Sequence, residues 1–230
     1  MLICPSSRLA FAHFAKTGGT SVARLIVQTY PDARWINPRD THVSVGASLK
    51  RMESRTVPIR SWLRSLRGVK PLVCAIRVAN PRSLRVLGVV RDPFAMAVSL
   101  FDHWNRKLPE GERHHSPLAS AATLGDFPEF LRILSGDAGH FPTYREFFDE
   151  GGPLWANTHL IDFDHLEDGL AEAREKLGLA LDPKALPHLN AGDPRRRQLA
   201  EREREAGDLA TALRRRYAWP GMPRLLGAPA

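Results

Sequence analysis

At two places in this chain a short hydrophobic run leads directly into a helix-like pattern. The first run, residues 9–14, has the length of a buried strand, and the apolar residues after it recur at helical spacing from Val22 to Ile26. The second run, residues 84–90, is rich in β-branched residues and is bounded by turn signals. The pattern therefore predicts two strand–helix units.

The start of the second helix is marked by its own residues. Asp92 is a natural N-cap, and Pro93 suits the first helical position. Arg91 is therefore expected at the carboxyl end of a strand, with Ser99 about two turns along the helix. Because ligands of open parallel sheets bind outside the carboxyl ends of strands, Arg91 and the loop after the first strand are expected at one edge.

The rest of the chain alternates in the same way. Further strands are expected at 72–76 and 155–162. Helices are expected from the first loop to about Tyr30, in pieces over 44–65, at 126–134 and at 143–148. Another helix is expected at 164–177, between an Asp164 cap and a Gly178 stop. The charged stretch 195–216 is also expected to be helical, and its Glu and Arg spacing favours a solvated face. Irregular links are expected at 32–41 and 186–192, and a long mobile loop at 107–122. Strands alternating with helices predict an α/β fold with a mainly parallel sheet.

Size and composition set broader limits. The 230 residues fit a single domain, 1–230, with a charged helical C-terminal region from about 195. No apolar run reaches the roughly 18 residues of a membrane span, and no secretory signal is evident. Cys4 and Cys74 have no metal-ligand spacing and are expected to be reduced thiols, so a cytoplasmic location is expected. The net charge of +8, mostly from arginine, admits nucleic acid, an acidic membrane surface or polyanionic small ligands.

Chemistry concentrates in the loop between the first strand and its helix, Lys16-Thr17-Gly18-Gly19-Thr20-Ser21. The glycines let the backbone approach a ligand closely. Thr20 or Ser21 can cap the helix, whose free N–H groups and positive dipole end then face the loop. This combination favours a phosphate site over an ordinary turn with a solvated lysine. The order is not that of Walker A, in which the lysine follows the glycines.

The loop resembles the 5′-phosphosulfate loop of sulfotransferases that use 3′-phosphoadenosine-5′-phosphosulfate (PAPS). The segment 89–93, with Ser99 eight residues after Arg91, resembles the 3′-phosphate motif of the same family. Segments 41–44 and 186–190 are similar to segments of the heparan and uronyl 2-O-sulfotransferases. The chain departs from that branch at Ala15, where proline is usual, and at Met96, where a second arginine is common.

The resemblance implies a P-loop-like three-layer fold, with a central, mainly parallel sheet flanked by helices. It also implies transfer of a sulfuryl group from PAPS to a hydroxyl acceptor, a glycan or glycosylated small molecule, with PAP as product, no metal and no nucleic-acid partner. The implied donor-binding residues are those of the two motifs: Lys16, Thr17, Gly18, Gly19, Thr20, Ser21, Arg91 and Ser99.

The implied catalytic residues are Lys16, on the bridging oxygen of the donor, and His42, as general base, with His103 as a second candidate. His13 is expected to pack beneath the loop. Two other functions stay open: a P-loop-type ATP-dependent kinase, and a non-enzymatic polyanion- or nucleic-acid-binding module whose arginines begin at 195–197. Acceptor identity and oligomeric state are not specified by these patterns.

Overall fold

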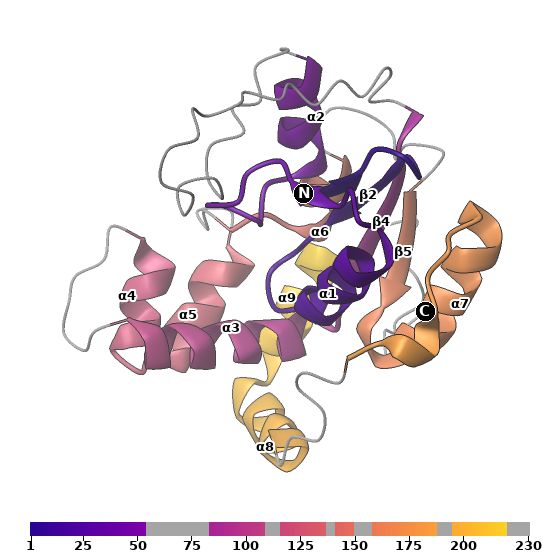
Figure 1. Ribbon diagram of the computed structural model, residues 1–230. Coiled ribbons are helices and arrows are strands. Elements are labelled where there is room, and N and C mark those ends of the chain that lie inside the picture. The colour runs from indigo at the N-terminus through magenta and orange to yellow at the C-terminus, as the bar shows by residue number, and fades with distance from the viewer. Residues whose placement is uncertain (54–82, 109–115, 137–140, 150–157, 188–194, 220–230) are drawn as a thin grey trace.

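A mixed α/β architecture is built on an open sheet that helices flank (Figure 1). The computed structural model describes residues 1–53, 83–108, 116–136, 141–149, 158–187 and 195–219. Within these residues the sheet has five strands in the order β3-β1-β2-β4-β5. The strands are β1 (Leu2–Cys4), β2 (Leu9–Ala12), β3 (Arg34–Trp35), β4 (Arg85–Val90) and β5 (Thr158–Asp162).

The sheet is mostly parallel. Strand β2 pairs in parallel with β4, and β4 pairs in parallel with β5. Strand β1 is antiparallel to both β2 and β3, so four of the five described strands run in the same direction. The parallel half of the sheet therefore places the carboxyl ends of β2, β4 and β5 at one edge.

Alternation along the strands divides the core into two layers. Ala10 and Val86 face one side, whereas Phe11 and Leu87 face the other, as the two-residue period of a strand requires. Helices α1 and α7 cover the Phe11 side, and α2, α3, α5, α6 and α9 cover the Ala10 side. Strands buried on both faces read as continuous apolar runs, which is why 9–14 and 84–90 stand out in the sequence.

The helices differ widely in length. Their bounds are α1 (Gly19–Thr29), α2 (Val45–Glu53), α3 (Pro93–Lys107), α4 (Pro117–Thr123), α5 (Phe127–Ser135), α6 (Tyr144–Asp149), α7 (Leu166–Leu177), α8 (Arg195–Ala206) and α9 (Asp208–Tyr217). Two short 3₁₀ turns are η3 (Phe163–His165) and η4 (Pro183–Ala185). None of the helices in the described ranges is long and apolar enough to cross a membrane.

Most of the expected elements are confirmed. The two strand–helix units form β2–α1 and β4–α3, and Asp92 accepts a hydrogen bond from the backbone N–H of Ala95, 2.9 Å away, as an N-cap should. Strand β5, helices α5 and α6, and the end of α7 at Gly178 also lie where the sequence predicts them. The expected strand at 72–76 lies outside the described residues.

Several expectations are wrong. Residues 117–122, expected in a loop, form α4, because the run after Pro117 is rich in alanine, the best helix former. The link 32–41, expected to be irregular, contains β3. This strand pairs with β1, which has only three residues and is not revealed by the hydrophobic pattern. Helix α7 is preceded by η3, and the carboxylate that caps this turn belongs to Asp162 instead of Asp164. The charged C-terminal stretch is helical as expected, but as two helices that meet at Gly207, where φ is +49°.

Candidate functional site

Three strand ends meet at one edge of the sheet. Ala12 of β2 lies opposite Gly88 of β4, and Val90 of β4 lies opposite Asp162 of β5. The Lys16 loop, Arg91 and Phe163 therefore all leave the sheet at its carboxyl edge. The prediction that the loop and Arg91 lie at the same edge of the sheet is confirmed by the strand register.

The loop enters α1 without a side-chain cap. Gly18, with φ +78°, is the N-cap residue, and α1 begins at Gly19. Thr20 and Ser21 therefore lie in the first turn, and the expectation that one of them caps the helix is wrong. Lys16 also has a positive φ, +62°, which is strained for a residue with a Cβ. The Thr17 hydroxyl is buried and donates to the Phe14 carbonyl, 3.1 Å away, closing the turn from inside.

The two glycines lie directly against protein side chains. A Cβ at Gly18 would overlap the Phe163 ring, and one at Gly19 would overlap the His13 ring. The sequence suggests that glycine lets the backbone approach a ligand, whereas these glycines let it approach Phe163 and His13. His13 packs beneath the loop, as expected. Burial, assisted by nearby His42 and Lys16, lowers the pKa of His13 to about 3, so its ring is neutral at physiological pH.

Phe163 joins the loop to Arg91. Its ring contacts Gly18, and the Arg91 guanidinium carbon lies 4.3 Å from the centre of the same ring. This is cation–π geometry. One aromatic side chain thus forms a common wall for the two motifs. Sequence reasoning missed Phe163, although its position directly after a predicted strand is a signal that could have found it.

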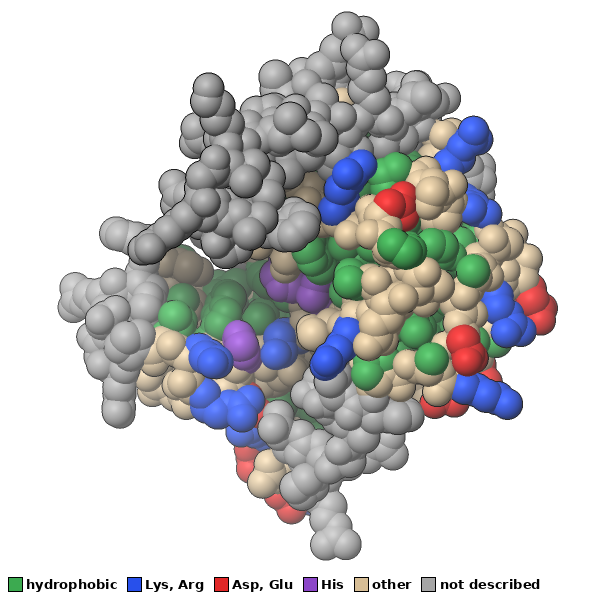
Figure 2. Space-filling model, viewed as in Figure 1, with side chains coloured by type: hydrophobic (Ala, Val, Ile, Leu, Met, Phe, Trp, Pro, Cys, Tyr) green, Lys and Arg blue, Asp and Glu red, His purple; other side chains and the backbone are tan. Residues whose placement is uncertain are grey.

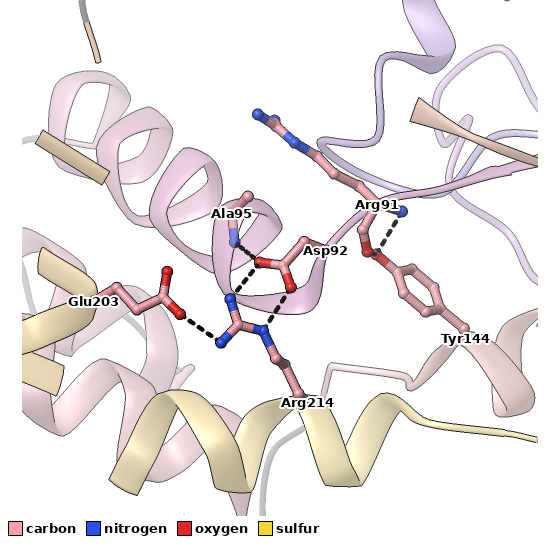
Figure 3. A network of polar contacts seen from close by, with 6 residues as sticks. All are labelled: Arg91, Asp92, Ala95, Tyr144, Glu203 and Arg214. Atoms are coloured by element: carbon pink, nitrogen blue, oxygen red, sulfur yellow. Dashed lines mark hydrogen bonds and ion pairs between the residues drawn. The ribbon is translucent and has the colours of Figure 1, made fainter. Parts of the chain in front are cut away.

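Tyr144 fixes the backbone of Arg91 (Figure 3). The Arg91 N–H donates to the Tyr144 hydroxyl oxygen, 3.2 Å away, and the same hydroxyl donates to the Arg91 carbonyl oxygen, 2.8 Å away. Tyr144 is fully buried, and burial raises the pKa of its hydroxyl, so the proton that it donates stays in place. The Arg91 side chain points away from this pair.

Asp92 connects the same segment to the C-terminal helices. Arg214 of α9 donates from Nε to Asp92 Oδ2, 2.7 Å away, and from Nη1 to Glu203 Oε1, 2.6 Å away (Figure 3). Burial disfavours the guanidinium charge, but the hydrogen bonds to Asp92 and Glu203 outweigh it and raise the pKa of Arg214. Arg202 forms a second such link to Asp102 of α3, at 2.9 Å. The expected solvated face over 195–216 is present in exposed residues such as Arg204 and Arg215, but Arg202 and Arg214 face the protein.

His42 is held in one tautomer. Its Nδ1 lies 2.9 Å from the backbone carbonyl oxygen of His13. Because a carbonyl oxygen only accepts hydrogen bonds, Nδ1 of the neutral ring must carry the proton, which leaves the Nε2 lone pair as the proton acceptor. The backbone N–H of His42 donates to Asp40 Oδ1, 3.2 Å away, which fixes the turn. The ring is exposed at the surface, as a general base has to be.

His103 and Ser99 both belong to α3. They are four residues apart and so share a face. Burial lowers the pKa of His103, and the nearby cations of Lys16, Lys107 and Arg106 lower it further. His103 is therefore within electrostatic reach of Lys16 but is a weak proton acceptor. Figure 2 shows cations close to histidines on one face of the molecule, where histidines lie in and beside a recess with Lys and Arg along its margin.

A cavity of about 570 Å³ opens beside His42. Its lining residues come from the 42–44 segment and from α6 and its approach: His42, Ser44, Pro142, Arg145, Glu146, Phe147 and Asp149. Its volume is within the range of small-molecule sites. The described residues include no group of three His, Cys, Asp or Glu side chains able to hold a metal ion. The side chains of 195–197 and the segment 188–190 lie outside what the structure describes.

The chain was compared with protein-family models, with curated proteins and with solved structures, and none of the three comparisons finds a significant match. Its function is therefore inferred from the residues and geometry of this site.

Proposed function

We propose that this protein is a sulfotransferase of P-loop-like three-layer fold that moves a sulfuryl group from PAPS to a hydroxyl acceptor, a glycan or glycosylated small molecule, in the cytoplasm. The observation that carries the proposal is that the Lys16 loop and Arg91 leave adjacent parallel strands at one edge and share Phe163 as a wall. A nucleotide with phosphates at both its 5′ and 3′ positions needs two such anion sites side by side.

The loop suits the 5′-phosphate. Helix α1 begins at Gly19 without a carboxylate in its first turn, so its positive end is not neutralised from within. Backbone N–H groups at a helix start bind phosphate oxygens without any side chain. Lys16 supplies a cation next to them. Arg91, with its backbone fixed by Tyr144, supplies the planar donor pair that recognises the 3′-phosphate, and Ser99 adds a hydroxyl.

In the proposed reaction the acceptor hydroxyl oxygen forms a bond to sulfur while the bond between sulfur and the bridging phosphate oxygen breaks. The electron pair of that bond stays on the phosphate oxygen, which leaves as part of PAP, and the Lys16 ammonium stabilises the charge that develops there. The hydroxyl proton passes to Nε2 of His42, the ring nitrogen that the His13 carbonyl leaves unprotonated. His103, with its lowered pKa, is the weaker candidate for this step.

Calorimetry with PAP, AMP and Mg-ATP tests the donor site. PAP should bind at least about tenfold more tightly than AMP, because a charge-assisted contact to the 3′-phosphate contributes that much. Arg91→Ala should remove the difference and leave AMP binding unchanged. Lys16→Ala and His42→Ala should both lose sulfate transfer from labelled PAPS, read by mass spectrometry. His42→Ala should keep PAP binding, whereas Lys16→Ala should weaken PAP and AMP binding by a similar factor, because both carry the 5′-phosphate. Arg24→Ala, exposed on α1, is the matched control and should change nothing.

Equal affinity for PAP and AMP would overturn the proposal. Preference for Mg-ATP over PAP would instead favour a P-loop-type kinase. Salt-sensitive binding of DNA or RNA that survives Lys16→Ala would favour a polyanion-binding module.

A further inference from the structure

The cavity beside His42 is joined to the loop by two contacts. The His42 ring hydrogen bonds to the carbonyl of His13, and the ring of Phe147, which also lines the cavity, lies 4.9 Å from the ring of Phe14. His13 and Phe14 directly precede the loop. The cavity therefore opens where an acceptor would have to lie for its hydroxyl to meet both His42 and a donor held by the loop.

The charges in this cavity differ from those around the loop. Among the described residues that line it, two are carboxylates, Glu146 and Asp149, and one is a guanidinium, Arg145. The loop side instead gathers cations, since Lys16, Lys107 and Arg106 all act on His103. The described lining of the cavity is thus more acidic than the loop side.

The two carboxylates are used differently. Glu146 caps its own helix, because its Oε2 accepts from the Thr143 N–H, 2.6 Å away, while its own N–H donates to the Thr143 hydroxyl. Asp149 Oδ1 is buried and has no hydrogen-bond partner among the described residues. A carboxylate with one buried oxygen that accepts no hydrogen bond is poorly compensated, so a cation that meets Asp149 where it lines the cavity gains affinity.

We propose that this cavity binds the acceptor, and that the acceptor is a polyhydroxyl compound with a protonated amine, such as an amino sugar. This inference rests on the proposed function. The ammonium pairs with the Asp149 carboxylate from the cavity side, and a hydroxyl at the other end lies against His42. A charged donor suits an ionised carboxylate better than a neutral hydroxyl does. Anionic sugars are disfavoured, because their carboxylate or sulfate would face Asp149 and Glu146.

Three monosaccharides of similar size separate the possibilities: glucosamine, methyl glucoside and glucuronate. Each is titrated at neutral pH into the full chain, with and without saturating PAP, and binding is read by saturation-transfer NMR. We expect glucosamine to bind about tenfold more tightly than methyl glucoside, and glucuronate more weakly than either. Asp149→Asn should reduce glucosamine affinity to that of methyl glucoside. Asp168→Asn, an exposed carboxylate on α7, is the control and should keep the preference.

Glucuronate binding as tightly as glucosamine, absence of binding by all three sugars, or a glucosamine preference that survives Asp149→Asn would each overturn the inference. PAP affinity, measured on the same samples, tests the donor site separately. A chain that prefers glucosamine but does not bind PAP would contradict the sulfotransferase proposal and leave the cavity assignment standing. A retained PAP affinity in Asp149→Asn shows that this variant is folded.

Discussion

His13 and Gly19 form a matched pair beneath the loop. The His13 ring fills the space that a Cβ at Gly19 would need, and a Cβ built there lies 2.7 Å from His13 Nε2. His13 is 8% exposed, so its ring has little room to move. The same ring packs at a tilt against His42, with 4.5 Å between ring centres and 52° between ring planes. The position of the loop and that of the proposed base therefore depend on one buried imidazole.

Gly19→Ala should lower the free energy of unfolding by about 1–3 kcal/mol, because overpacking in a rigid core costs that much. Urea denaturation measures the change. A double-mutant cycle with His13→Ala supplies the control, since the added methyl should cost much less once the ring is gone. Equal costs of Gly19→Ala in both backgrounds would show that the ring is not the obstacle.

Helices α8 and α9 do more than add charge at the end of the chain. Through Arg214 and Arg202 they hold the start and the middle of α3, and α9 buries Leu213 and Tyr217 in the core (Figure 1). The cap of α3, next to Arg91, is therefore part of a network that begins at the C-terminal helices.

Arg214→Ala should lower stability by about 1–3 kcal/mol, because it leaves the half-buried Asp92 without its charged donor. It should also weaken PAP binding more than AMP binding, since Arg91 is the residue next to the disturbed cap. Thermal unfolding and calorimetry measure the two effects. Arg215→Ala, exposed on the same helix, should change neither. Unchanged PAP binding in Arg214→Ala would show that the Asp92–Arg214 network does not affect the donor site.

Strong local patterns account for the elements that the sequence predicts. Strand β2 and β4 after Arg85 are continuous apolar runs, and α3 carries its cap and proline in adjacent residues. Strands β1 and β3 are too short to show a period, and β3 depends on pairing with β1. In the site, motif residues such as Lys16 and Arg91 could be proposed from their spacing. Tyr144 and Arg214 could not, because they reach the motif across 53 and 122 residues of sequence.

At the scale of the whole molecule, burial of neutral histidines makes stability depend on pH. Burial lowers the pKa of His13 to about 3 from its usual 6.5, and it also lowers the pKa of His103 and of His159. Between about pH 3 and pH 6.5, the unfolded chain therefore binds more protons at His13 than the folded chain does. Stability rises with pH in that window, and it falls as the pH drops below about 6.5.

We expect the free energy of unfolding to fall from pH 6.5 toward pH 4, with His13 contributing at most about 1.4 kcal/mol per pH unit. His13→Leu should reduce this slope, whatever its effect on stability at neutral pH. His165→Leu, at an exposed histidine, is the control and should keep the slope. Denaturant titrations at several pH values measure it, and an unchanged slope in His13→Leu would contradict the assignment.

The link between Asp92 and Arg214 also sets an order of events during synthesis. The aspartate that starts α3 emerges from the ribosome 122 residues before its arginine partner. Strands β2 and β4 can pair as soon as both have been made, but the polar network around the α3 cap is complete only when almost the whole chain is free. A nascent chain stalled before α9 should therefore already contain the paired strands while its nucleotide-binding edge is still unfinished.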